Sequence, residues 1–423
     1  MLFARLSAAS RNMNEPLAKY STEIRSDAKA LATVRETPHI PQLDGIRGIA
    51  IVLVLLVHLG AIMRVVGVGR YLGFGWMGVD LFFVLSGFLI TRILVATRDE
   101  GSYYRRFYVR RGLRIWPLYY LYLVITTVCV VAVQHTPGLR SLVNSLSPLK
   151  IVTPLPMYLV FFQNLYRPSL FCFRDFMAIT WSLCIEEHFY LAWPVMVRRF
   201  PLSTLKVVLA TVLLVSPFLR LGSWFLLRDQ PYEIFYQTIT RFTLLHLDAI
   251  CAGCLLSLFW NDLKDVSRYK RLFAALFIAG LAGSAFTYIA TNGYVFAFCY
   301  SALAVMFSGL VGLALLGWQD KLFTNPALRY VGKISYGIYL IHPVVFEVFQ
   351  SHTMFRKVGL ERHTYIAEIL AATLAIIISF LVASISWKFL ESPILRLKTR
   401  LQANHGRDGR GGVMDRVSAR VTF

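Results

Sequence analysis

Apolar runs of roughly 17–25 residues recur along this 423-residue chain, and each is long enough to cross a bilayer as a helix. Hydrophobic residues make up 57% of the sequence and charged residues only 16%, a composition that excludes an ordinary soluble protein. Because a bilayer offers no partners to backbone polar groups, runs of this kind are expected to form helices. The sequence therefore predicts an all-α integral membrane protein.

About ten of these runs are expected to span the membrane. The predicted spans are 46–66, 76–97, 113–133, 179–198, 204–227, 242–260, 272–291, 294–317, 332–350 and 366–390. Clusters of arginine and lysine follow the second, fourth, sixth and last spans, so all of them lie on one side if both termini are cytoplasmic. A shorter apolar piece at 154–165 contains Pro154 and Pro156 and is expected to be re-entrant or interfacial. An eleventh crossing there would place some of the basic clusters outside.

The spans divide the chain into three parts. Residues 1–41 have mixed charge and lack the apolar core of a signal peptide, so we expect a cytoplasmic leader that is disordered or amphipathic. Residues 42–392 form the transmembrane domain, and 393–423 form a basic cytoplasmic tail. The net charge of +21 is explained by membrane topology and anionic lipid headgroups, and we expect no nucleic-acid partner. The six cysteines lie mostly in apolar runs, where packing is favoured over a metal site.

The first span carries two side chains that are costly in hydrocarbon, Arg47 and His58. At about 100° per residue their spacing places both on one helix face, roughly 16 Å apart along the axis. That face offers a cation at the cytoplasmic mouth and an imidazole near mid-bilayer. In the structural alternative, Arg47 extends to the interface and His58 hydrogen-bonds a neighbouring helix. For the two residues together, the functional interpretation is favoured.

A second group lies in RRFYVRRGLRIWPLYYLYL, at the start of the third span. Arg111 and Arg114 are three residues apart and share a helix face, where like charges repel and favour an anionic partner. Guanidinium groups bind phosphate in a bidentate way, so a ligand that carries a diphosphate fits. Topology and lipid headgroups alone explain the neighbouring Arg105 and Arg106, but explain Arg114 less well.

A third group lies in WSLCIEEHFYLAWP, in the fourth span. Glu186 and Glu187 adjoin His188, and such a set can perform acid–base chemistry once it is buried. Adjacent residues point about 100° apart, so only one of the two glutamates can face a given site. The structural alternative is a polar helix contact at the outer interface, with Trp181 as an aromatic anchor.

Other polar residues of the apolar segments are weaker candidates. Asp80 precedes a Ser86-Gly87 pair that is typical of close helix packing. His342 precedes Pro343, which is expected to kink its helix, and can belong either to a site or to the packing. The complete set of further candidates is Asp44, Asp80, Ser86, Trp181, Glu187, Asp248 and His342.

Six segments taken together resemble the membrane acyltransferase family three, the acyl-CoA-dependent O-acyltransferases of surface glycans and some small molecules. In chain order they are LDGIRGIAIVLVLLVH, GVDLFFVLSGFLITR, RRGLRIWPLYYLYL, WSLCIEEHFYLAWP, HLDAICAGCLL and ISYGIYLIHPVV. Arg47 and His58 match the family's arginine and histidine of the first span, and Arg111 and Arg114 match its R-x-x-R motif. The W-S-L-x-x-E motif assigns Glu186. The leader is longer than is usual, and the short tail resembles the stand-alone members that lack an appended hydrolase-like domain.

The resemblance implies a reaction as well as a fold. The donor would be acyl-CoA, with acetyl-CoA expected, bound through its phosphates by Arg47, Arg111 and Arg114; no permanent cofactor or metal is expected. His58 would act as a general base or as a transient acyl carrier, and Glu186 would orient or reprotonate it. The acceptor would be a hydroxyl of an exported or lipid-linked glycan, or of a glycosylated small molecule.

The apolar spans and the family resemblance also predict where the protein is located. We expect a multi-pass protein of a cell membrane, the bacterial inner membrane, with the lipid bilayer, glycan-assembly proteins or further copies of the chain as partners.

The alternative function is a multi-span transporter of an anionic or acylated solute, because charges inside spans also line transport pathways. No inverted repeat supports it, and the arginines gather at one side. A purely structural scaffold would leave Arg47 and His58 unexplained.

Overall fold

The structure, a computed structural model, describes residues 39–63, 69–136, 155–165, 177–260, 265–290, 293–350 and 365–396. The predicted leader and tail lie almost wholly outside these residues, as does most of the segment between the third and fourth predicted spans. Helices and short turns make up the described part of the chain, and no strand occurs in it, which confirms the all-α class.

Helices of very different lengths alternate along the sequence. They are α2 (Pro41–Ile62), α3 (Gly69–Leu72), η1 (Gly73–Met77), α4 (Gly78–Ala96), α5 (Tyr103–His135), α7 (Leu155–Leu159), η3 (Ala178–Thr180), α8 (Trp181–Arg199), α9 (Leu202–Leu227), α10 (Tyr232–Arg241), η4 (Thr243–Leu245), α11 (Asp248–Trp260), α12 (Val266–Ile289), α13 (Gly293–Phe296), α14 (Cys299–Leu315), α15 (Asp320–Phe323), α16 (Pro326–Lys333), α17 (Ser335–Gln350), α19 (Tyr365–Ser386) and the π-helical turn η5 (Trp387–Glu391).

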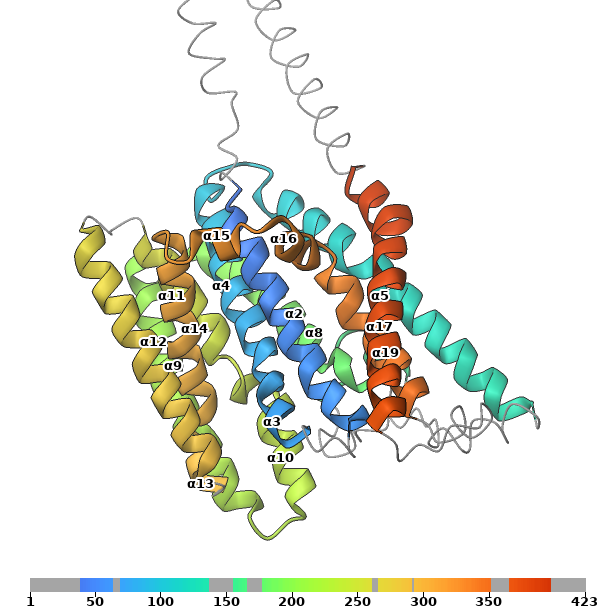
Figure 1. The fold of residues 1–423 in the computed structure, drawn as a ribbon. Coiled ribbons are helices and arrows are strands. Elements are labelled where there is room, and N and C mark those ends of the chain that lie inside the picture. Colours follow the sequence, from blue (N-terminus) through green and yellow to red (C-terminus); the bar gives the residue numbers. More distant parts are fainter. Residues whose placement is uncertain are drawn as a thin grey trace, which may run out of the picture. The chain divides into compact units, whose positions relative to one another are not determined.

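Within residues 40–423, α2 and α4 occupy the middle of a helical bundle (Figure 1). On one side α4 packs against α11, and α12 packs against α14. On the other side α2 packs against α17, which in turn contacts α19. The short helix α16 covers the N-terminal half of α2, where a Cβ atom on Gly48 would overlap the Leu328 carbonyl oxygen. The helix that carries Arg47 and His58 is therefore enclosed by neighbours on several sides.

In the part of the chain that the structure describes, six helices are long and apolar enough to cross a membrane, with α4 counted together with η1 and α19 together with the turns that follow it. They correspond to the predicted first, second, third, fifth, seventh and tenth spans. Three more predicted spans appear as shorter apolar helices: α11, α14 and α17. The remaining one, α8, carries two glutamates and ends in two arginines. The number of ten crossings and the cytoplasmic termini therefore stay predictions.

Helix boundaries differ from the predicted ones where local structure intervenes. The span predicted at 242–260 begins as a helix only at Asp248, because a 3₁₀ turn occupies Thr243–Leu245. The span predicted at 113–133 begins at Tyr103, since the arginine-rich stretch before it is also helical. The segment predicted to be re-entrant or interfacial contains the five-residue helix α7, which is too short to cross a bilayer. The Tyr119 hydroxyl of α5 donates a hydrogen bond of 2.8 Å to the Tyr158 carbonyl of α7.

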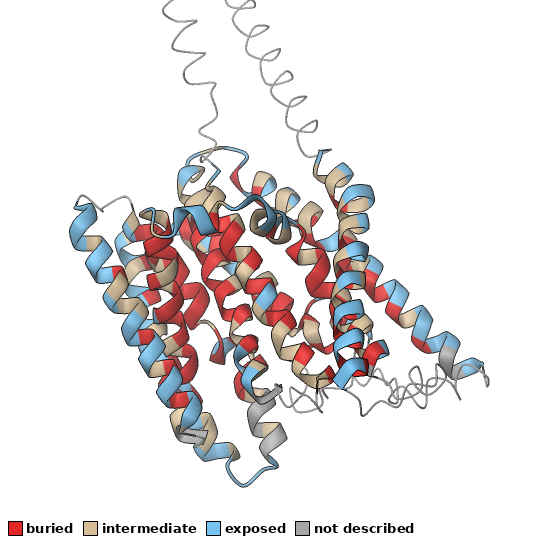
Figure 2. Cartoon of the chain, viewed as in Figure 1, coloured by how far each residue is buried: buried red, intermediate tan, exposed pale blue. Residues whose placement is uncertain are grey.

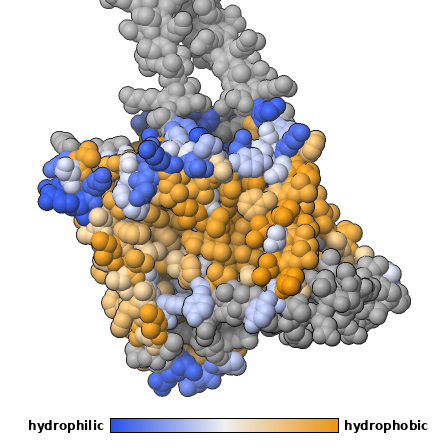
Figure 3. Space-filling model, in the orientation of Figure 1, coloured by the Kyte–Doolittle hydropathy of each residue, from blue (hydrophilic) through white to orange (hydrophobic). Residues whose placement is uncertain are grey.

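Buried residues line the inner faces of the central helices, whereas outer faces are exposed (Figure 2). On the face drawn in Figure 3, an apolar band crosses the bundle and hydrophilic residues gather at its two ends. Large apolar side chains such as Leu214, Ile278 and Ile377 are exposed on α9, α12 and α19. This pattern is that of helices with one face against the protein and the other against lipid.

Two glycines allow α4 and α11 to approach closely. A Cβ atom on Gly87 would overlap the Ile250 carbonyl oxygen, and one on Gly253 would overlap the Val84 carbonyl oxygen. The prediction that Ser86-Gly87 marks a close packing point is confirmed for Gly87. This crossing fixes the position of Ser86, which directly precedes Gly87 in α4 and hydrogen-bonds to Glu186 of α8.

We predict that Gly87→Ala lowers the free energy of unfolding by about 1–3 kcal/mol, because the added methyl group meets backbone that cannot move away. The matched control is Gly222→Ala on α9, where an added Cβ meets nothing within 4 Å. That control should leave the melting temperature unchanged or slightly raised, since alanine favours helix. Thermal unfolding of both variants in detergent measures the difference. Equal melting temperatures would contradict the tight crossing.

Candidate active site

Three arginines from two helices gather at one end of the bundle and form what we call the arginine cluster: Arg47 of α2 with Arg111 and Arg114 of α5. The charges of Arg111, Arg114 and Glu186 all act on the Arg47 guanidinium. All three arginines are partly exposed. None of them makes a hydrogen bond or a close ion pair with another described residue; Arg111 only stacks over the Tyr190 ring, 5.6 Å from its centroid. The structure thus brings the predicted cationic residues together.

Like charges without partners are unfavourable inside a helical bundle. The three guanidinium groups offer up to fifteen N–H donors, at five per arginine, and these donors fit phosphate or carboxylate oxygens. An anionic ligand would relieve both the repulsion and the unmet hydrogen-bonding capacity. The arrangement therefore differs from a structural ion-pair network, in which each arginine would have an acidic partner at hydrogen-bonding distance.

Glu186 of α8 faces this cluster. Its Oε1 accepts a hydrogen bond of 2.6 Å from the Ser86 hydroxyl of α4, and its charge acts on Arg111 as well as on Arg47. Two of the predicted candidates, Glu186 and Ser86, are thereby joined. The Glu187 Oε2 accepts a long bond of 3.4 Å from the Trp116 ring nitrogen, and its charge also acts on Arg111. The expectation that only one glutamate can face the site therefore stays a prediction.

A second carboxylate near the cluster was not predicted from the sequence. Glu391 ends the π-helical turn η5 after α19, where the wider turn lies over α5 and the side chain is 8% exposed. Its Oε1 accepts a bond of 3.2 Å from the Ser386 hydroxyl, and the charges of Arg114 and Arg47 act on it. The one available signal was an acidic residue directly after the last predicted span.

His58, toward the other end of α2, contacts a second histidine. The ring centroids of His58 and His342 of α17 are 4.7 Å apart, in an edge-to-face arrangement. The His58 Nδ1 lies 2.8 Å from the Val54 carbonyl oxygen, and the His342 Nδ1 lies 2.9 Å from the Ile338 carbonyl oxygen. Phe346 packs against both rings. The structure therefore places the candidate His342 directly beside His58.

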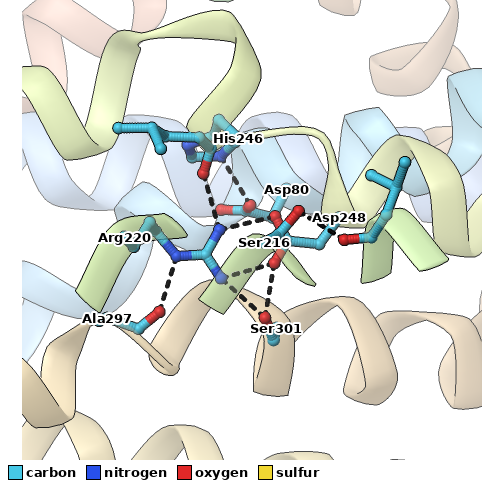
Figure 4. Close-up of polar contacts among 9 residues, drawn as sticks. Asp80, Ser216, Arg220, His246, Asp248, Ala297 and Ser301 are labelled. Carbon is cyan, nitrogen blue, oxygen red and sulfur yellow. Dashed lines mark hydrogen bonds and ion pairs between the residues drawn. The ribbon is translucent and has the colours of Figure 1, made fainter. Parts of the chain in front are cut away.

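The remaining candidates lie around a separate buried network (Figure 4). Arg220 of α9 is fully buried and forms a bidentate pair with Asp248, at 2.9 Å and 2.6 Å. Its other donors reach the Ala297 and Leu245 carbonyls and the Ser301 hydroxyl, each at 2.7 Å. All five N–H groups of this arginine are thus satisfied. These hydrogen bonds link α9 to α11 through Asp248 and to α14 through Ser301.

Asp80 and His246 lie beside this network. The His246 Nε2 is 2.9 Å from the Asp80 Oδ1, and both side chains are about 1% exposed (Figure 4). The His246 ring contacts the ring of Trp181, with centroids 5.4 Å apart. Asp80, Trp181 and Asp248 therefore belong to the packing around His246 and Arg220, and none of them contacts the arginine cluster. Arg220 was missed from the sequence, although an arginine inside a predicted span was a usable signal.

Among the described residues, no group of three or more His, Cys, Asp or Glu side chains is placed to hold a metal ion. Asp44, in the first turn of α2, lies within electrostatic range of Arg47. His188 makes a 2.9 Å contact through Nδ1 with the Thr243 hydroxyl and does not reach His58. The chemistry available at this site consists of arginines, a hydrogen-bonded glutamate and two imidazoles.

Comparison with known proteins identifies the family of this chain. The profile of a family described as an acyltransferase domain matches residues 40–388. The chain belongs to this acyltransferase family. The resemblance found in the six sequence segments is thereby confirmed, and the apolar helices make this family member a multi-pass membrane protein.

Two relatives illustrate the match. Over 375 residues the chain is 28% identical to the peptidoglycan O-acetyltransferase OatA of Listeria monocytogenes. The aligned region covers 84% of this chain and 56% of that protein. Over 392 residues it is 28% identical to the O-acetyltransferase OatA of Staphylococcus aureus. Here the aligned region covers 87% of this chain and 59% of that protein. The chain thus spans just over half the length of these relatives. No solved structure matches it.

We predict that Asp248→Asn destabilises the fold by about 3–5 kcal/mol, because it leaves the buried Arg220 charge uncompensated. The control is Asp229→Asn, which removes an exposed carboxylate 3.9 Å from Arg228 and should leave the melting temperature unchanged. Thermal unfolding in detergent compares the two variants. A stable Asp248→Asn protein without acyltransferase activity would instead assign Asp248 to the chemistry.

Proposed function

We propose that this protein is a membrane O-acyltransferase that moves an acyl group from cytoplasmic acyl-CoA, with acetyl-CoA as the donor, to a hydroxyl of an exported or lipid-linked glycan. The observation that carries the proposal is the arginine cluster, whose three cations have no hydrogen-bonding partner among the described residues. One of them, Arg47, lies on the helix that also carries His58. A cationic cluster and an imidazole joined by this helix suit a substrate with phosphates at one end and a thioester at the other.

The arginine cluster would hold the phosphates of the donor. Bidentate guanidinium–phosphate bonds combine affinity with a fixed orientation. The charges of Arg47 and Arg111 act on Glu186, and those of Arg114 and Arg47 act on Glu391. The two carboxylates limit the repulsion among the arginines when no ligand is bound. Glu186, fixed by Ser86, would keep Arg47 and Arg111 oriented toward the ligand.

The two ends of the donor fit the spacing along α2. Arg47 and His58 are separated by about three helical turns, or roughly 16 Å, and the pantetheine arm of coenzyme A is long and thin enough to bridge such a distance between helices. The thioester would then meet the His58 imidazole. With Nδ1 bonded to the Val54 carbonyl, the neutral ring has its lone pair on Nε2, which can act as a base or as a nucleophile.

The acceptor and the cellular setting are proposed from the relatives and the topology. One relative bears the name peptidoglycan O-acetyltransferase, and a wall or surface glycan is the acceptor class we propose here. Ten crossings with both termini in the cytoplasm would place the arginine cluster at the cytoplasmic face of a bacterial inner membrane. Glycan-assembly proteins or a second copy of the chain would act at the outer face.

We predict that the double variant Arg111→Ala/Arg114→Ala weakens acetyl-CoA binding by at least about 10-fold, since a hydrogen bond to a charged group contributes about 1.5–3 kcal/mol. Calorimetry in nanodiscs measures the dissociation constant. Acetyl-pantetheine, which has the same thioester without the nucleotide phosphates, should lose no affinity. The matched control is Lys270→Ala/Arg271→Ala, which removes two exposed cations from α12. Unchanged acetyl-CoA binding by the first variant would overturn the phosphate assignment.

We predict that His58→Ala abolishes acyl transfer, while acetyl-CoA binding and the melting temperature stay close to those of the original protein. Release of CoA and transfer of radiolabelled acetyl groups measure the activity. His135→Ala is the control, because His135 makes the same bond to the carbonyl four residues earlier but is exposed at the end of α5. Full activity of His58→Ala would remove the central element of the proposed function.

A further inference from the structure

Two imidazoles from distant parts of the chain meet inside the bundle. His58 of α2 and His342 of α17 have ring centroids 4.7 Å apart and ring planes at 78°. His342 is fully buried, whereas His58 is partly exposed. One ring therefore has access to a substrate, and the other lies directly behind it.

The hydrogen bonds of the two rings define their chemistry. Each Nδ1 faces the carbonyl oxygen four residues earlier, at 2.8 Å for His58 and 2.9 Å for His342. A carbonyl oxygen only accepts, so Nδ1 carries the hydrogen in both rings. The neutral rings then have their lone pairs on Nε2. Neither Nε2 has a hydrogen-bond partner among the described residues, and that of His342 is buried as well.

A purely structural role explains His342 poorly. A buried nitrogen without a partner is costly, and an apolar side chain of similar size would pack against Phe346 without that cost. The edge-to-face contact also restricts charge, because two imidazolium rings at this separation would repel strongly in an apolar environment. When His58 carries a positive charge, His342 is therefore kept neutral, with its Nε2 free to accept a proton.

We propose that the two histidines divide the reaction between them: His58 carries the acyl group, and His342 takes the proton from the acceptor hydroxyl. This inference rests on the proposed function and assigns the second half of that reaction. Among the described residues, His342 is the buried imidazole whose ring contacts that of His58.

The two steps balance as follows. The His58 Nε2 attacks the thioester carbon, a C–N bond forms, the C–S bond breaks, and CoA leaves as the thiolate. The acylated ring is then cationic, and its Nδ1–H bond to the Val54 carbonyl stabilises that charge. In the second step the hydroxyl oxygen attacks the acyl carbon, a C–O bond forms and the C–N bond breaks. The hydroxyl proton passes to the His342 Nε2, and His58 returns neutral; His342 later releases the proton to the thiolate or to water.

The test separates the two steps with the variant His342→Asn in the full-length protein in nanodiscs. Asparagine can retain the bond to the Ile338 carbonyl but lacks an atom equivalent to Nε2. With radiolabelled acetyl-CoA, we expect one equivalent of CoA released and label retained on His58, at a rate close to that of the original protein. Transfer to glycerol, used as a hydroxyl probe, should fall by about 100-fold or more, the usual contribution of a general base.

Hydroxylamine provides the decisive comparison, because this strong nucleophile needs no base to remove the acyl group. The original protein and His342→Asn should form acetyl-hydroxamate at similar rates. Phe346→Leu, which alters the packing of both rings, is the control and should affect glycerol and hydroxylamine equally. A proportional loss of both products in His342→Asn, or undiminished transfer to glycerol, would overturn the assignment, as would the absence of label from His58 in the original protein. Failure of the original protein to release CoA at all would instead refute the proposed function.

Discussion

The cost of placing charge in hydrocarbon determines how the helices of this protein are oriented. Arginine, aspartate, glutamate and histidine occur within otherwise apolar helices, and each must face the interior of the bundle. The close glycine contacts between α4 and α11 and between α2 and α16 bring the polar faces together. Large apolar residues consequently remain on the outer faces, where a bilayer would surround them.

The interior charges fall into two kinds that serve different purposes. The charge of Arg220 is matched by Asp248, and each of its donors has an acceptor, so this pair fastens three helices and has no capacity left for a ligand. The arginine cluster has the opposite character, with three cations that lack hydrogen-bond partners among the described residues. The same residue type thus stabilises the fold in one place and leaves hydrogen-bond donors without partners among the described residues in another, and the difference lies in whether hydrogen bonds are completed.

Much of the fold follows from the sequence, since hydrophobic length depends on local composition. Every predicted span corresponds to a helix in the described part of the chain, and Pro156 lies in the short helix α7 where a full span was not expected. The errors occur at helix ends. Neither the 3₁₀ turn before Asp248 nor the helical arginine-rich start of α5 changes the apolar pattern enough to be recognised. Composition alone does not fix the number of spans either, because α8 carries two glutamates and two arginines and α11 is short.

The sequence by itself determined that Arg47 and His58 share a helix face, because the α-helical period fixes the direction of side chains on one element. It also determined that Arg111 and Arg114 repel each other, which favours an anion. Only the tertiary structure decided that these arginines converge with Glu186 and Glu391, and that His342 rests against His58. Those contacts join helices that lie far apart in the chain. They depend on how whole helices pack, and neither composition nor spacing within one segment encodes that packing.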